Sequence, residues 1–221
     1  MAILLLVGAT GLVGREVLRL ALADPRVKHL TAPTRRPLPA HSHLSNPRID
    51  FDALPPDNPW WKADAVICTL GTTLRKAGSK EEFRRIDHDL PLQIATLARD
   101  HGTRAFALTS STGADPRAKS FYLRTKGELE RDLDSCGFPS LTLVRPSLIG
   151  GKRDESRPAE RLAMIFMAAF HPLIPRRFRM VPAESIARAL LEAALAAIPG
   201  RHVIESEGIR AAEPMKRHSP K

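Results

Sequence analysis

The sequence is poor in aromatic residues, which make up 5% of the 221 residues. Its basic residues are spread along the chain, so neither a recognition helix nor a base-stacking platform is visible despite a net charge of +10. An anionic small ligand and a generally basic surface explain this charge at least as well. We therefore expect no specific nucleic-acid partner.

Cysteine and long apolar runs are also scarce. Cys68 and Cys136 are far apart and lack metal-ligand spacing, which argues against a disulfide framework or a metal site and favours the reducing cytoplasm. The longest late apolar run, residues 162–170, is about half of the roughly 18 to 20 residues needed to cross a bilayer. The sequence predicts a soluble cytoplasmic protein with no membrane span, as a monomer or a homodimer.

Short apolar runs alternate with helical patterns along the chain. Runs typical of buried strands lie at residues 3–7, 29–34, 48–51, 63–70, 104–109 and 141–144, and helical periodicity covers residues 12–23, 81–101, 118–135 and 184–197. This alternation predicts an α/β fold, a doubly wound parallel Rossmann sheet with helices on both faces. We expect one domain over residues 1–208, with a small helical substrate region at about 150–185 and a basic mobile tail at 209–221.

Three glycines lie between the first predicted strand and the first predicted helix. Gly8, Gly11 and Gly14 are spaced three apart, in the strand–turn–helix context that a dinucleotide-binding turn requires. Without side chains there, pyrophosphate oxygens can reach backbone N–H groups at the positive end of the helix. The pattern predicts a dinucleotide site, although a plain structural turn would use the same residues.

The cofactor preference follows from an absence of acidic residues. Many NAD-binding folds hold the ribose 2′-hydroxyl with a carboxylate about twenty residues after the glycines, yet this chain has no Asp or Glu between Asp24 and Asp50. Arg35 and Arg36 follow the second predicted strand instead. Because a guanidinium binds phosphate by charge-assisted hydrogen bonds, NADP(H) is favoured over NAD(H).

The single tyrosine of the chain lies four residues before a lysine. This spacing puts Tyr122 and Lys126 on one face of a predicted helix, where the ammonium would stabilise a phenolate and assist proton exchange. The strand before this helix ends in hydroxyl-bearing residues, at the sheet edge where open α/β folds bind ligands. Among them Ser111 is placed to hydrogen-bond a substrate carbonyl.

Together the glycines, Ser111, Tyr122, Lys126 and the Arg-Pro-Ser at 145–147 resemble the short-chain dehydrogenase/reductase superfamily in its extended or atypical form. Residues 68–78, 110–115 and 155–160 look like the branch that includes the Tat-interacting protein, which implies NADPH binding and a reductase-like architecture. The resemblance implies a pyrophosphate contact for 10–13, a 2′-phosphate contact for Arg35, and adenine or nicotinamide contacts for others. The implied cofactor-binding set is Gly8, Thr10, Gly11, Leu12, Val13, Gly14, Arg35, Asp50, Phe51, Leu70, Gly71, Thr72, Lys126 and Pro146.

These observations lead to a hypothesis of hydride transfer between NADP(H) and a small carbonyl or alcohol. Tyr122 would donate the proton, Lys126 would tune it and bind ribose, and Ser111 would orient the carbonyl. Two alternatives stay open, a nucleotide-sugar epimerase or dehydratase and a non-catalytic NADPH sensor or scaffold. The apolar segment 164–170 is expected to line a core or pocket, and the basic segment 176–179 to be a solvated loop.

Overall fold

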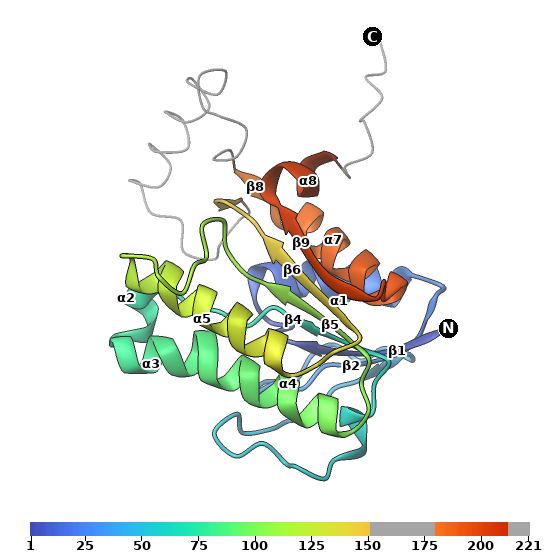
Figure 1. The fold of residues 1–221 in the computed structure, drawn as a ribbon. Coiled ribbons are helices and arrows are strands. Elements are labelled where there is room, and N and C mark those ends of the chain that lie inside the picture. The colour runs from blue at the N-terminus through green and yellow to red at the C-terminus, as the bar shows by residue number, and fades with distance from the viewer. Residues whose placement is uncertain (151–179, 212–221) are drawn as a thin grey trace, which may run out of the picture.

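The computed structural model describes residues 1–150 and 180–211 and shows a parallel sheet between two layers of helices (Figure 1). Seven strands pair in the order β3-β2-β1-β4-β5-β6-β9. Their bounds are Ala2–Val7 for β1, Val27–Thr31 for β2, Leu44–Ser45 for β3, Ala65–Cys68 for β4, Ala105–Thr109 for β5, Ser140–Arg145 for β6 and Gly200–Glu205 for β9. The predicted Rossmann sheet is therefore confirmed.

Helices cover both faces of the sheet. Those of the described residues are α1 (Leu12–Ala23), α2 (Leu74–Ala77), α3 (Lys80–Arg84), α4 (Leu90–Asp100), α5 (Phe121–Ser135), α7 (Ala183–Ala196) and α8 (Ser206–Ala211), with a short 3₁₀ turn at Pro59–Trp61. One apolar core joins α1 and α7 to the sheet, and a second joins α4 and α5 to its other face. Each fully buried Leu, Ile or Phe in these cores contributes about 1.5–3 kcal/mol.

The chain reverses its direction of winding at β1. Strands β2 and β3 lie on one side of β1, and β4, β5, β6 and β9 lie on the other. The crevice outside the carboxyl ends of β1 and β4 is thus the switch point where open α/β sheets bind ligands. The glycine turn after β1 opens into this crevice.

A π-helical turn interrupts the long predicted helix. Residues Arg85–Asp89 form this turn between α3 and α4, and the Leu90 N–H donates to the carbonyl of Arg85, five residues back. Pro91 at the start of α4 has no N–H, so an α-helical bond to the carbonyl of Asp87 cannot form there. The helical stretch expected at residues 81–101 is therefore divided just before Pro91, and Asp87 and His88 in the wider turn are buried.

Three predictions about elements need correction. The third strand is Leu44–Ser45 rather than residues 48–51, because Leu30 and Ala32 donate their N–H groups to the carbonyls of 43 and 45, and Arg48 makes only an isolated bridge. No strand was predicted at β9, which pairs with β6 along its whole length. A two-stranded parallel pair, β7 (Ile149–Gly150) with β8 (Val181–Pro182), was also not predicted.

The predicted C-terminal regions fall largely outside the described residues. Helix α8 covers residues 209–211 of the predicted tail, and the remainder of that tail is not among the residues described. Most of the predicted substrate region, including segments 164–170 and 176–179, also lies outside them.

Candidate functional site

Close packing explains the glycine turn. A Cβ on Gly14 would lie 2.0 Å from the carbonyl oxygen of Gly8, and one on Gly8 would lie 2.6 Å from Thr69 Oγ1. Gly8 also has a φ of +91°, which side chains rarely adopt. Gly11 is the N-cap residue of α1 and has no side chain, so no capping side chain competes for the N–H groups of the first turn. The turn can therefore receive the oxygens of a pyrophosphate.

The loop after β2 holds Arg35 at the surface of the protein. Asn46 fixes the loop, since its Nδ2 donates to the Ala32 carbonyl at 2.6 Å and to Thr34 Oγ1 at 2.8 Å. Its Oδ1 accepts the Leu38 N–H at 2.7 Å. Arg35 is exposed, and within residues 1–150 and 180–211 it forms no ion pair. A free guanidinium on a fixed loop suits an anionic group of the ligand.

Asp50 and Phe51 lie in a turn after the isolated bridge. The Asp50 carboxylate accepts the Asp52 N–H at 2.9 Å, and Phe51 packs against the second core. A cavity of about 500 Å³ opens beside Phe51. The residues that line it are Phe51, Asp52, Glu82, Arg85, Asp89, Leu90 and Gln93.

A buried ion pair connects α5 to the π-helical turn. Lys126 Nζ lies 2.8 Å from Asp87 Oδ1, and the residues are 3% and 0% exposed. Asp87 Oδ2 accepts the Thr72 N–H at 2.7 Å, and a Cβ on Gly71 would lie 3.6 Å from Lys126 Nζ. The loop after β4, the lysine and the aspartate therefore form one unit at the crevice.

Electrostatics keep this lysine charged. Burial lowers the pKa of Lys126, but the Asp87 carboxylate and the nearby Tyr122 oxygen outweigh burial, so the net pKa lies above its usual value. An ammonium at this place can donate to ribose hydroxyls or stabilise negative charge on a phenol oxygen. The structure thus shows a buried lysine that is paired with Asp87 and has a raised pKa, and its role towards a cofactor stays a prediction.

Tyr122 lies one turn before Lys126 on α5 and is partly exposed. Its ring packs against that of the fully buried Phe83, with centroids 5.6 Å apart. This contact packs one side of the phenol ring against the core of the protein. A partly exposed phenol can still exchange a proton with a substrate.

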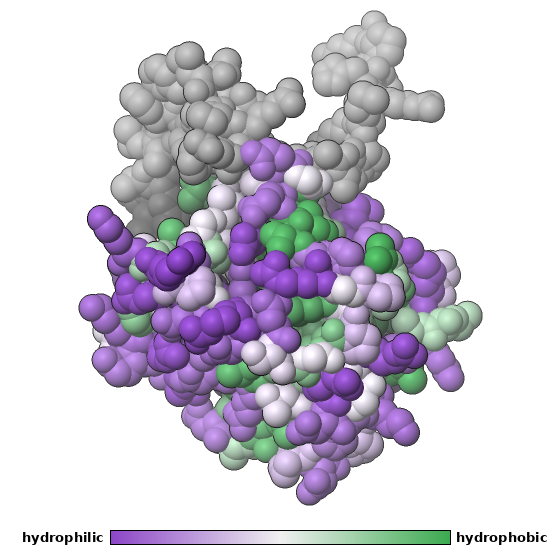
Figure 2. All heavy atoms as spheres, in the orientation of Figure 1, coloured by the Kyte–Doolittle hydropathy of each residue, from purple (hydrophilic) through white to green (hydrophobic). Residues whose placement is uncertain are grey.

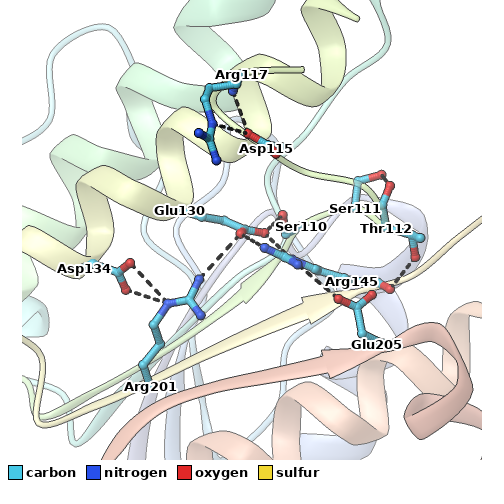
Figure 3. Close-up of polar contacts among 10 residues, drawn as sticks. All are labelled: Ser110, Ser111, Thr112, Asp115, Arg117, Glu130, Asp134, Arg145, Arg201 and Glu205. Carbon is cyan, nitrogen blue, oxygen red and sulfur yellow. Dashed lines mark hydrogen bonds and ion pairs between the residues drawn. The ribbon is translucent and has the colours of Figure 1, made fainter. Parts of the chain in front are cut away.

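The loop after β5 brings Ser111 to the same edge of the sheet. Thr112 donates its N–H to the Pro146 carbonyl at 3.0 Å and its hydroxyl to the Arg145 carbonyl at 2.9 Å, which ties this loop to the end of β6. Ser111 Oγ makes a long contact of 3.4 Å with the Thr112 carbonyl (Figure 3). A weak partner leaves this hydroxyl available for a stronger acceptor.

Helix α5 and this loop pack without space for a side chain at Gly127. A Cβ there would lie 2.2 Å from the Asp115 carbonyl carbon and 2.4 Å from Pro116 N. The loop that carries Ser111 is therefore packed directly against the helix that carries Tyr122.

Asp87 was not among the site residues predicted from the sequence. The structure brings Lys126, Gly71 and Thr72 together around it, and Ser111 together with Pro146. The available signal was an acidic residue four positions before a proline inside a helical pattern, which is too weak to identify a lysine partner thirty-nine positions later.

The sheet order and the glycine turn define a Rossmann-fold protein. Two solved structures share this fold, and their sequences are 19% and 15% identical to this chain. They are "MoeE5 in complex with UDP-glucose and NAD", with a TM-score of 0.71 over 91% of this chain and 74% of that chain, and a Bacillus cereus UDP-glucuronic acid 4-epimerase in complex with UDP-glucuronic acid and NAD, with 0.69 over 92% and 77%. No protein-family profile matches the chain.

The chain belongs to the Fmp52 family. It is 38% identical over 178 residues to "Protein fmp52, mitochondrial" of Emericella nidulans, covering 76% of each chain. It is 34% identical over 212 residues to the protein of that name in Aspergillus clavatus, covering 90% of each. The Candida albicans protein is 34% identical over 160 residues, covering 68% of this chain and 69% of its own.

These relatives overturn the prediction of a cytoplasmic location, because their names assign them to mitochondria. The physical reason is that a low cysteine count constrains the redox state of a compartment and does not identify the compartment. Among the described residues, no helix is both long and apolar enough to cross a membrane. Hydrophilic residues cover most of the described face drawn in Figure 2.

Proposed function

We propose that the protein is an NADP(H)-dependent oxidoreductase of the short-chain dehydrogenase type that acts on a small carbonyl or alcohol. The buried Lys126–Asp87 pair carries this proposal. Burying a charged pair is costly, and here the pair lies beneath the loop at the switch point with the only tyrosine of the chain one turn away.

The residues at the crevice fit a dinucleotide. Gly8, Gly11 and Gly14 form a tightly packed turn with no side chain at the first turn of α1, so a pyrophosphate could approach the backbone N–H groups there. The pyrophosphate would lie along residues 10–13, and the adenine beside Asp50 and Phe51. Leu70, Gly71 and Thr72 would lie beneath the cofactor, Pro146 near the nicotinamide, and Lys126 at the adjacent ribose.

The preference for NADP(H) is supported by Arg35. No carboxylate lies between Asp24 and Asp50 in the sequence, so nothing local repels a 2′-phosphate. The Asn46 contacts hold the loop, which lowers the entropy that Arg35 would lose on binding. MoeE5 and the Bacillus cereus UDP-glucuronic acid 4-epimerase are complexes with NAD, and Arg35 is the feature that would set this chain apart.

When bound, the nicotinamide supplies or accepts the hydride, and the chain handles the proton. Tyr122 would donate its phenolic proton to the carbonyl oxygen as the carbonyl carbon is reduced to an alcohol. Lys126 would stabilise the resulting phenolate, and solvent would return the proton. Ser111 would donate to the same carbonyl oxygen and orient it.

The narrower resemblance to the branch of the Tat-interacting protein belongs to this proposal, and it rests on the motifs at residues 68–78 and 110–115. One other enzymatic function is favoured by an observation. The solved structures of this fold include proteins titled as nucleotide-sugar epimerases. An epimerase would turn over without net consumption of NADPH, whereas a carbonyl reductase consumes one equivalent for each product.

The test is NADPH oxidation with a panel of aldehydes and ketones, using the wild type and Tyr122→Phe. We expect Tyr122→Phe to lower kcat by about 100-fold or more while the Kd for NADPH changes less than about twofold. Lys119→Met, an exposed lysine just before α5, is the control and should match the wild type. Full activity in Tyr122→Phe would overturn the proton-donor role, and turnover of no carbonyl despite tight NADPH binding would favour a sensor.

A further inference from the structure

A second ion pair joins the buried Glu130 to the partly buried Arg145 (Figure 3). Glu130, on α5, is 2% exposed, and its carboxylate accepts from Arg145 Nε at 2.9 Å. Arg145 Nη2 bonds the other carboxylate oxygen, so the pair is bidentate. Ser110 donates its hydroxyl to Glu130 Oε1, which completes a junction of three side chains.

Each member of this junction adjoins a residue of the candidate site. Ser110 immediately precedes Ser111, and Arg145 immediately precedes Pro146. Glu130 lies one turn after Lys126 and two turns after Tyr122 on the same face of α5. The junction therefore connects the three segments that carry the reacting groups, namely the end of β5, helix α5 and the end of β6.

We propose that Ser110, Glu130 and Arg145 are positioning residues that fix Ser111 relative to Tyr122 and Lys126. This inference rests on the proposed function. A bidentate pair fixes both distance and orientation, and a buried carboxylate cannot exchange its partner for water without a large penalty. The Ser110 hydroxyl then transmits that fixed geometry to the next residue of the loop.

The junction continues outward to the last strand of the sheet. Arg145 Nη1 lies 3.0 Å from Glu205 on β9, and Arg201 Nε lies 2.9 Å from Asp134. Arg201 Nη2 also lies 3.8 Å from Glu130 Oε2, so Arg201 is a more distant fourth neighbour of the junction, and Asp134→Asn leaves this contact and the three side chains of the junction in place. Glu205, Arg201 and Asp134 are each more than two fifths exposed at the side chain, so these outer pairs contribute little to stability. They supply a matched comparison, because Asp134 is also a carboxylate on α5 that pairs with an arginine.

The experiment compares Ser110→Ala, the double variant Glu130→Gln with Arg145→Met, and the control Asp134→Asn. Ser110→Ala leaves the bidentate pair intact and removes only the link to the loop. We expect it to lower kcat about 10-fold, with the Kd for NADPH within about twofold of wild type. We expect the double variant to lower kcat about 100-fold, because it removes both hydrogen bonds of the bidentate pair together with the acceptor of the Ser110 hydroxyl. Asp134→Asn should match the wild type.

Hydrogen exchange measured on the NADPH-loaded protein provides a readout that does not depend on turnover. We expect the amides of residues 110–118 to exchange faster in Ser110→Ala and in the double variant, and unchanged in Asp134→Asn. Wild-type kcat in Ser110→Ala, or unchanged exchange in both variants, would overturn the positioning role. If the wild type reduces no carbonyl, the proposed function fails by itself, and the exchange rates still decide whether the junction fixes this loop.

Discussion

Lys126 Nζ and Asp87 Oδ1 lie 2.8 Å apart with both side chains buried, so the positive charge of Lys126 on α5 is neutralised by Asp87 in the π-helical turn. The second oxygen of Asp87 accepts the Thr72 N–H, which couples the orientation of the lysine to the loop after β4. A lysine held in this way cannot swing out to solvent. The position of its ammonium is thus set before any ligand binds.

The first prediction concerns this pair. Asp87→Asn keeps an acceptor for the Thr72 N–H and removes the negative charge, so it leaves a buried ammonium without its partner. We expect the free energy of unfolding at pH 7 to fall by about 3–5 kcal/mol, measured by urea denaturation. Asp52→Asn, which disrupts an exposed pair with Arg85, should cost less than about 1 kcal/mol. Equal losses in the two variants would contradict a special role for the buried pair.

The second prediction concerns how the stability difference between wild type and Asp87→Asn depends on pH. The folded-state pKa of Lys126 is raised above its unfolded value, because the charges of Asp87 and Tyr122 outweigh the opposing effect of burial. The stabilisation is therefore complete below about pH 10.4 and is lost as the pH rises through the folded-state pKa. We expect the difference in stability between wild type and Asp87→Asn to shrink as the pH rises, because Lys126 without the Asp87 charge loses its proton at a lower pH in the folded variant than in the wild type. A difference that grows with alkaline pH would contradict this sign.

The third prediction contrasts two helical glycines. A Cβ on Gly14 would lie 2.0 Å from the Gly8 carbonyl oxygen, whereas one on Gly208 would make an ordinary contact of 3.5 Å with Ile204. We expect Gly14→Ala to lower the free energy of unfolding by at least about 3 kcal/mol. Gly208→Ala should raise it by up to about 1 kcal/mol, because alanine is the better helix former. Thermal denaturation of both variants tests the opposite signs.

The fourth prediction concerns cofactor selectivity. Arg35→Ala removes a charge-assisted contact with a 2′-phosphate, worth about 1.5–3 kcal/mol. We expect the Kd for NADPH to rise about 10- to 100-fold, with little change for NADH, in a fluorescence titration. Arg36→Ala is the control for a general loss of positive charge. Parallel losses for both cofactors would show that Arg35 does not contact the 2′-phosphate.

The fifth prediction uses the two cysteines. Burial raises the pKa of the Cys68 thiol to about 11, and Cys136 is only partly buried. At pH 8 we expect alkylation of Cys136 first, and modification of Cys68 at least about 100-fold more slowly, because its thiol reacts only after local opening. Peptide mass spectrometry assigns the sites. Equal rates would mean that the end of β4 opens readily in the folded protein.

The sequence predicted those features that depend only on residues within one short segment. The residue spacing of α1 predicted its bounds, and the glycine turn has a steric reason visible in Gly8 and Gly14. The one-turn separation of Tyr122 and Lys126 follows from helical geometry alone. The third strand was misplaced because pairing with β2, rather than local apolar character, selects Leu44–Ser45.

By itself the sequence determined the Rossmann sheet, the glycine turn after β1 and the Tyr122–Lys126 face, since these depend on periodicity and on backbone geometry over a few residues. Only the tertiary structure decided that Asp87 is the partner of Lys126, that Glu130 joins Arg145, and that β9 completes the sheet. A carboxylate in a sequence looks the same whether solvent or a buried cation will surround it. How distant segments pack decides whether a carboxylate is surrounded by solvent or by a buried cation. A carboxylate that is buried beside a cation is held in place, because separating the two charges would leave one of them without a partner.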